Sequence, residues 1–161
     1  MTDEGDERKV PDELAALDAQ LRRAERRAEH RVDPGPTALV VSVAMLVLIG
    51  ALLLPWTGSV HGWEVLAGLA PLGLLPPLFA GTSLAFGLVC SALALATRWF
   101  GLAWLAAVGC GFSVVTGLWA IWSRQVAVPA GATGPGVGLV LAVLAVLVLA
   151  ASWVRIALRR E

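Results

Sequence analysis

Side chains that could do acid–base or metal chemistry are few in the long apolar part of this sequence. His61 and Glu64 have the spacing His-x-x-Glu, which would place both side chains on one face of a helical turn. Two ligands do not complete a zinc site, because zinc in proteins takes four. Cys90 and Cys110 both lie in apolar stretches and are expected to be small buried side chains. The sequence therefore predicts no metal site, no cofactor and no catalytic residue.

The distribution of charge along the chain limits the class of protein. The 161 residues are 58% hydrophobic and 15% charged, whereas an average soluble domain is about 45–50% apolar and about 25% charged. Ten of the twelve acidic and seven of the twelve basic residues lie in the first 33 positions. Between Thr37 and Val154 the only Asp, Glu, Lys or Arg residues are Glu64, Arg98 and Arg124. This pattern argues against a soluble enzyme and a nucleic-acid binder, and it predicts an integral membrane protein.

Four apolar stretches are long enough to cross a bilayer as helices, which takes about 20 residues. The expected fold class is therefore all-α, a four-helix transmembrane bundle. Arg98 separates the second and third stretches and marks a tight turn, because a single helix over both would be twice as long as the bilayer is thick. The expected spans are residues 37–54, 78–97, 99–122 and 137–154.

The transmembrane domain of residues 37–155 is expected to have outer loops at 55–77 and 123–136, followed by a short basic tail at 156–161. A charged segment, residues 1–36, precedes it and is expected to form a cytoplasmic amphipathic helix over about 11–31. One narrow apolar stripe follows that helix, with steps of three and four residues. The stripe fits either a short coiled coil or a helix on a membrane surface. Its residues are Leu14, Leu17, Leu21, Ala24 and Ala28.

Basic residues determine the expected orientation. With both termini in the cytoplasm, eleven of the twelve lie on the cytoplasmic side and only Arg124 lies outside, as the positive-inside rule requires. Arginine outnumbers lysine eleven to one, which is typical of a GC-rich bacterial genome. The expected location is therefore a bacterial plasma membrane, crossed four times. An aromatic belt, favoured over a ligand cage, is expected to anchor both interfaces, through Trp56, Trp63, Trp99, Trp119, Trp122 and Trp153.

Small residues recur along the second and third spans at helical spacing. Such faces let helices approach closely, so a tightly packed central hairpin is expected, with the first and fourth spans more exposed to lipid. A gated pore between the small faces is the alternative, but no ionisable residue lies at depth to support it. The candidate packing residues are Gly87, Ser91, Gly109, Ser113 and Gly117.

The expected outer loop from Pro55 to Pro77 suggests two interactions. Glu64 and Arg124 are the only opposite charges on the outer side, and we expect either an ion pair or two separately solvated charges. The stretch from Val65 to Pro77 is apolar but interrupted by prolines, so it cannot form a regular span. It is expected to dock on a partner or to cap the protein's own spans. The candidate docking residues are Leu69, Leu72, Leu74 and Leu75.

Three short stretches carry a resemblance to a known family. They are Leu54-Pro55-Trp56-Thr57-Gly58-Ser59, Ala120-Ile121-Trp122-Ser123-Arg124-Gln125 and the run Gly134 to Leu141. Over residues 35 to 155 the chain resembles an uncharacterised actinobacterial family of small four-span, alanine-rich membrane proteins known from mycobacteria. The resemblance implies the same four-span layout and location, and it implies no activity, ligand or catalytic residue.

Taken together, these features predict a protein that is not an enzyme. The expected function is that of an accessory or scaffold subunit that binds other membrane or envelope proteins, and the alternative is a small transport or channel component acting as an oligomer. The expected partners are the lipid bilayer and either a membrane protein or further copies of the chain. Neither a nucleic acid nor a small-molecule substrate is expected.

Overall fold

In a computed structural model of the chain, residues 35–70, 72–126 and 134–158 are described. Contacts divide the chain into two units, residues 1–32 and 33–161, and the description below concerns the second. The helix predicted over 11–31 lies outside the described residues. The elements follow in the order α2 (Gly35–Leu53), β1 (Pro55–Thr57), β2 (Val60–His61), α3 (Gly62–Leu66), α4 (Leu75–Thr82), the π-helix η1 (Ser83–Cys90), α5 (Ser91–Thr97), α6 (Phe100–Val126) and α7 (Val137–Leu158).

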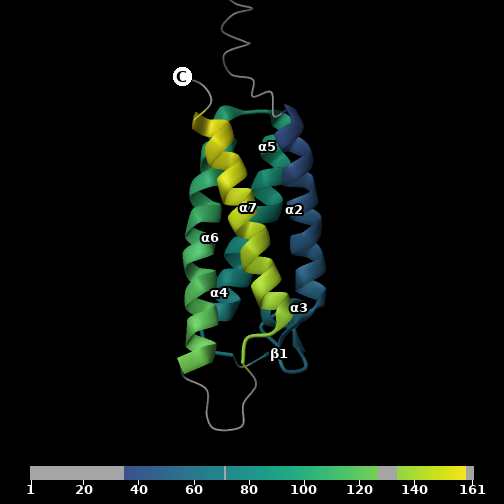
Figure 1. Cartoon of the computed structure of the whole chain (residues 1–161), viewed down its shortest axis with the longest axis vertical. Helices are drawn as coiled ribbons and strands as arrows, with labels where there is room; N and C mark the ends of the chain where they lie inside the picture. Colours follow the sequence, from purple (N-terminus) through teal and green to yellow (C-terminus); the bar gives the residue numbers. More distant parts are fainter. Residues whose placement is uncertain (1–34, 71, 127–133, 159–161) are drawn as a thin grey trace, which may run out of the picture. The chain divides into compact units, whose positions relative to one another are not determined.

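Four long helical rods lie side by side in this unit (Figure 1). One rod is continuous through α4, η1 and α5, and the other three are α2, α6 and α7. Helix α7 packs against both α2 and α6. Over the most apolar part of each helix, 56% of the residues are buried in α7 but only 28% in α2. The fourth span is therefore the most buried of the four long helices, whereas the sequence predicted that it would be among the more exposed.

The chain turns back between α5 and α6 at Arg98. This residue has a φ of +52° and ψ of 28°, in the left-handed region that ends many helices. Its backbone N–H donates to the carbonyl of Ala94 at 2.9 Å, which satisfies one of the last carbonyls of α5. Helix α6 then begins at Phe100, so two residues reverse the chain direction.

Helix α4 begins at Leu75, three residues before the predicted start of the second span at Leu78. Pro76 and Pro77 lie in its first turn, where a missing backbone N–H breaks no helical hydrogen bond. The predicted loop 55–77 is also partly ordered. Strands β1 and β2 form an antiparallel hairpin, in which Gly58 occupies the turn with a φ of +56°.

The π-helix η1 lies in the middle of the second rod, where the backbone widens by one residue per hydrogen-bonded turn. The hydroxyl of Ser91, directly after η1, donates to the carbonyl of Phe86 five residues earlier, at 3.0 Å. Other hydroxyls in the long helices bond to their own backbone in a similar way. These are Thr82, Ser83, Thr97, Ser113, Thr116, Ser123 and Ser152.

Helix α6 approaches its neighbours through positions that lack a side chain. A Cβ atom on Gly109 would overlap the ring of Phe86 in η1. A Cβ atom on Gly117 would lie 2.7 Å from Val143 of α7 and 2.9 Å from Phe79 of α4. In contrast, nothing lies within 4 Å of the corresponding position on Gly111. The two neighbouring glycines 109 and 111 therefore differ sharply in the space around them.

We predict that Gly109→Ala destabilises the bundle and that Gly111→Ala does not. Overpacking a tight contact costs about 1–3 kcal/mol, whereas replacing an unhindered helical glycine by alanine stabilises by up to about 1 kcal/mol. Thermal unfolding of the two purified variants measures the difference. Equal unfolding midpoints would show that the Phe86 ring moves away without cost.

Candidate functional site

Trp56 is fully buried where the β-hairpin meets the ends of the long helices. Its indole N–H donates to the carbonyl of Ala51 at 2.9 Å, and its own carbonyl accepts from the backbone N–H of Gly136 at 2.6 Å. The sequence predicted Trp56 as an interface anchor, but the structure places it in the core. Burial of this side chain is tolerated because its indole N–H has a hydrogen-bond partner, and the backbone carbonyl has one as well.

Two glycines make this arrangement possible. Gly62 lies against the indole of Trp56, and Gly136 lies against the carbonyl of Pro55, so that a Cβ atom on either would overlap its neighbour. Gly136 precedes α7, and its bond to Trp56 ties the start of that helix to the hairpin. Although the sequence contains both glycines, their spacing alone does not reveal this contact.

His61 and Glu64 form a helix cap. The backbone N–H of His61 donates to the Glu64 carboxylate at 2.7 Å, and the imidazole Nδ1 lies 3.6 Å from the same oxygen. Glu64 occupies the first turn of α3, where a carboxylate is favoured by the helix dipole. Among the described residues there is no group of three or more His, Cys, Asp or Glu that could hold a metal.

Arg124 lies in the last turn of α6. Its Nε is buried and has no hydrogen-bond partner among the described residues. Because the carboxylate of Glu64 is engaged with His61 instead, the structure does not bring Glu64 and Arg124 together as an ion pair. The sequence pattern identified the two charges but could not show that a nearer partner competes for Glu64.

We predict that Glu64→Gln and Arg124→Gln act independently. Loss of the Glu64 cap should lower the stability by about 0.5–2 kcal/mol, and the double variant should equal the sum of the singles within about 0.5 kcal/mol. Chemical or thermal unfolding of the three purified variants gives the coupling energy. A coupling well above that limit would mean that the two charges interact after all.

A second set of polar groups lies inside the bundle, around the end of η1. The indole N–H of Trp153 in α7 donates to the hydroxyl of Ser91 at 2.9 Å. Cys110 of α6 lies beside Ser91, and the thiol of Cys90 donates to the carbonyl of Leu102 at 3.7 Å. Trp153 was predicted at an interface, but only 1% of its surface is exposed. This cluster links three rods by hydrogen bonds, and no spacing or motif in the sequence indicates it.

The predicted packing residues are all buried, and the second rod packs against α6 as expected, but these residues also contact the other two rods. Gly87 faces Leu48 of α2 and Leu149 of α7, while Ser91 faces Trp153. Gly109 and Gly117 face the second rod, and Gly117 also faces α7. Ser113 is fully buried and bonds to its own helix. The small residues therefore serve contacts to α2 and α7 as well as the expected contact between the second and third spans.

The remaining predicted residues lie at the surface of the unit. Of the leucines proposed for docking, Leu69 and Leu74 are exposed, and Leu72 and Leu75 are half-buried. The tryptophans other than Trp56 and Trp153 expose about half or more of their surface, and those predicted as anchors are Trp63, Trp99, Trp119 and Trp122.

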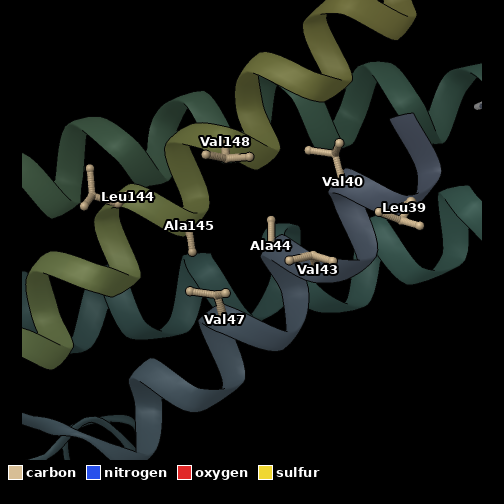
Figure 2. Close-up of a pocket in the computed structure, with 8 residues that line it drawn as sticks. All are labelled: Leu39, Val40, Val43, Ala44, Val47, Leu144, Ala145 and Val148. Atoms are coloured by element: carbon tan, nitrogen blue, oxygen red, sulfur yellow. The ribbon is translucent and has the colours of Figure 1, made fainter. Parts of the chain in front are cut away.

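An apolar groove opens between the first half of α2 and the middle of α7 (Figure 2). Its volume is about 330 Å³, at the lower end of the range for ligand pockets. Ala44 and Ala145 are almost fully buried at its base, and larger side chains form its walls. The lining residues are Leu39, Val40, Val43, Ala44, Val47, Leu144, Ala145 and Val148. No pattern in the sequence indicates this groove.

Comparison with known proteins identifies the family. The sequence profile of a family described as the MiaB C-terminal domain matches residues 18–161. The chain belongs to this family. It is also 45% identical over 148 residues to the tRNA-2-methylthio-N(6)-dimethylallyladenosine synthase of Mycobacterium avium (strain 104), a match that covers 89% of the chain and 21% of that enzyme. The chain thus spans about a fifth of the length of this curated relative. No solved structure matches the chain.

Membership of the MiaB C-terminal domain family corrects the predicted family, which was a group of small four-span proteins. It also corrects the predicted function. The relative is named as a synthase and is therefore an enzyme, which contradicts both the expected non-enzymatic scaffold and the alternative transport component. The prediction was wrong because the ionisable residues of a single domain do not show whether its family includes enzymes.

The expected partners and location are corrected by the same finding. The relative is named for a tRNA product, whereas the sequence predicted no nucleic acid and only lipid, membrane-protein or self-association partners. The predicted multi-pass plasma-membrane location with two cytoplasmic termini conflicts with this likeness to a tRNA-modifying enzyme. The apolar composition of one domain does not show whether its family acts on RNA.

Proposed function

We propose that this MiaB C-terminal domain acts in the formation of 2-methylthio-N(6)-dimethylallyladenosine in tRNA. The observation that carries the proposal is the 45% identity over 148 residues to a synthase named for that product. An identity of this size extends along nearly the whole chain, since the match covers 89% of it. It therefore includes the helical bundle and is not confined to one short motif.

The bundle takes a supporting part in this proposal. Among the described residues there is no group of three or more His, Cys, Asp or Glu that could hold a metal, and Cys90 and Cys110 are buried within the bundle. The reacting groups would then be supplied by the part of such a synthase that corresponds to the other four fifths of the relative. The helical domain would hold or position that part.

We predict that deleting the codons for residues 18–161 in the native host lowers 2-methylthio-N(6)-dimethylallyladenosine in tRNA toward the level of a strain without the synthase. Mass spectrometry of nucleosides from digested tRNA measures this. Restoring the wild-type chain or Gly111→Ala should restore the nucleoside, whereas Gly109→Ala should restore less because it disturbs the Phe86 contact. An unchanged nucleoside level in the deletion strain would refute the proposal.

For the fold class, we propose that the four long helices of this domain form a transmembrane bundle. Among the described residues, four helices are long and apolar enough to cross a membrane, judged by length and composition. Large apolar side chains cover their outward faces, for example Leu46 at 68%, Val108 at 62% and Leu144 at 51% exposure. Soluble monomers rarely expose contiguous apolar patches larger than a few hundred Å². The hydroxyls that bond to their own helix backbone also suit surroundings without water.

This second proposal states only that lipid surrounds the four long helices. It does not include the plasma-membrane topology or the scaffold role that are corrected above. A domain of a tRNA-modifying enzyme and a bundle embedded in lipid are compatible, because the proposed reacting groups lie in another part of the synthase.

We predict that the chain, synthesised in a cell-free system with phospholipid vesicles, floats with the vesicles and stays with them after alkaline carbonate treatment. Vesicles containing brominated lipids should quench the fluorescence of Trp104 and Trp119, since both side chains are about half exposed on α6. A variant in which the other exposed tryptophans, Trp63, Trp99 and Trp122, are changed to phenylalanine keeps the buried hydrogen bonds of Trp56 and Trp153 and leaves Trp104 and Trp119 as its exposed fluorophores. A chain that remains soluble and unquenched would rule out the transmembrane bundle.

A further inference from the structure

The groove between α2 and α7 is suited to a hydrocarbon chain. All eight lining side chains are aliphatic, so the walls offer no hydrogen bond to a polar ligand. Along α2 the groove extends from Leu39 to Val47, which is about 12 Å at 1.5 Å per residue. Figure 2 shows the lining side chains along neighbouring stretches of α2 and α7. A long flexible chain fits such a groove better than a compact polar molecule.

One end of the groove leads towards a basic residue. Arg155 lies seven residues after Val148 and eleven after Leu144, both of which line the groove. Seven and eleven residues are close to two and three whole turns of an α-helix, so Arg155 shares their face of α7. It lies about 10 Å beyond Val148 along the helix axis, and its side chain is exposed.

The register of the two helices places this arginine at the end of the groove. Helices α2 and α7 are antiparallel, because Gly138 contacts Ala51 and Leu54 while Ala145 faces Ala44 across the groove. The same register carries Arg155 to the level at which α2 begins. An aliphatic groove that ends at an exposed cation has the charge and shape of a site for a lipid with an anionic headgroup.

We propose that the groove binds one acyl chain of an anionic phospholipid whose phosphate pairs with Arg155. The site rests on the transmembrane bundle proposed above and is independent of the role in tRNA modification. The aliphatic walls select the chain without regard to headgroup, and Arg155 selects the negative headgroup. The two parts of the site therefore make separable contributions.

The test uses the full chain purified in a non-ionic detergent and incubated with equal amounts of phosphatidylglycerol and phosphatidylcholine that carry the same acyl chains. Native mass spectrometry counts the bound lipids. We expect one lipid per chain, with phosphatidylglycerol preferred about fivefold, the effect of one basic residue near a lipid surface. Arg155→Gln should abolish the preference, and Arg155→Lys should keep it. Equal binding of the two lipids to the wild-type chain would overturn the role of Arg155.

Variants that fill the groove test its apolar part. Val43→Trp and Leu39→Trp each place a large ring at the wall and should abolish retention of both lipids. Leu46→Trp is the matched control, because Leu46 is 68% exposed on the same helix and does not line the groove. Unfolding midpoints of all three variants show whether they fold. If folded Val43→Trp and Leu39→Trp both retain the lipid, the acyl chain does not occupy the groove.

The outcomes separate this proposal from the other two. A chain that floats with vesicles but binds both lipids equally would refute the lipid site and leave the transmembrane bundle intact. A chain that fails to float would refute the bundle, and with it the lipid site. Neither result depends on tRNA, because the lipid assay contains none and the tRNA assay does not measure lipid.

Discussion

Close approach of helix backbones at positions without a side chain controls the packing of this bundle. The rings of Phe86 and Phe79 occupy the spaces that Cβ atoms on Gly109 and Gly117 would fill, and Leu48 occupies the same kind of space beside Gly87. Where the exterior of a bundle is as apolar as its interior, burial of apolar surface distinguishes poorly between one helix arrangement and another. Shape complementarity and internal hydrogen bonds then determine the arrangement. The hydrogen bond from the indole N–H of Trp153 to the hydroxyl of Ser91 adds a directional contact between α7 and the second rod.

These contacts also explain why α7 is the most buried of the four long helices. A helix rich in leucine and valine looks suitable for contact with lipid, and sequence composition alone predicts that position for it. In the structure, Leu149 and Val146 of α7 are fully buried because the glycine at position 87 and the small face of α6 provide room for them. A large side chain of the neighbouring helix fills the space left by a small residue, as Leu149 does beside Gly87. The exposure of a helix therefore depends on its partners as much as on its own residues.

The lengths of the apolar stretches and the positions of turn residues predict where the long helices lie. They predict much less about the groove and the buried hydrogen bonds. The predicted span 78–97 and the helical run 75–97 differ only at the end where two prolines fit a first turn. The sequence and the structure both place the chain reversal at Arg98.

In contrast, the general preference of tryptophan for membrane interfaces predicts an exposed position. It cannot reveal that Trp56 and Trp153 have hydrogen-bond partners in the core. The groove and the cap between His61 and Glu64 depend on contacts that only the folded chain shows. Function was furthest from reach, since run lengths, charge and turn residues do not indicate the family, which only the comparison with known proteins shows.

The π-helix adjusts the rotational phase of the second rod. Because η1 closes its turns with bonds to the fifth residue, it holds more residues per turn than α4 and α5 on either side. If the same eight residues closed as regular α-helix, everything beyond them would rotate by about 100°, the turn of the one extra residue that the π-helix absorbs. Ser91 would then turn away from Trp153, although the apolar length and composition of the rod would not change. The wide winding of this eight-residue stretch is therefore constrained by geometry, whereas exchanges among its aliphatic residues are constrained only by volume.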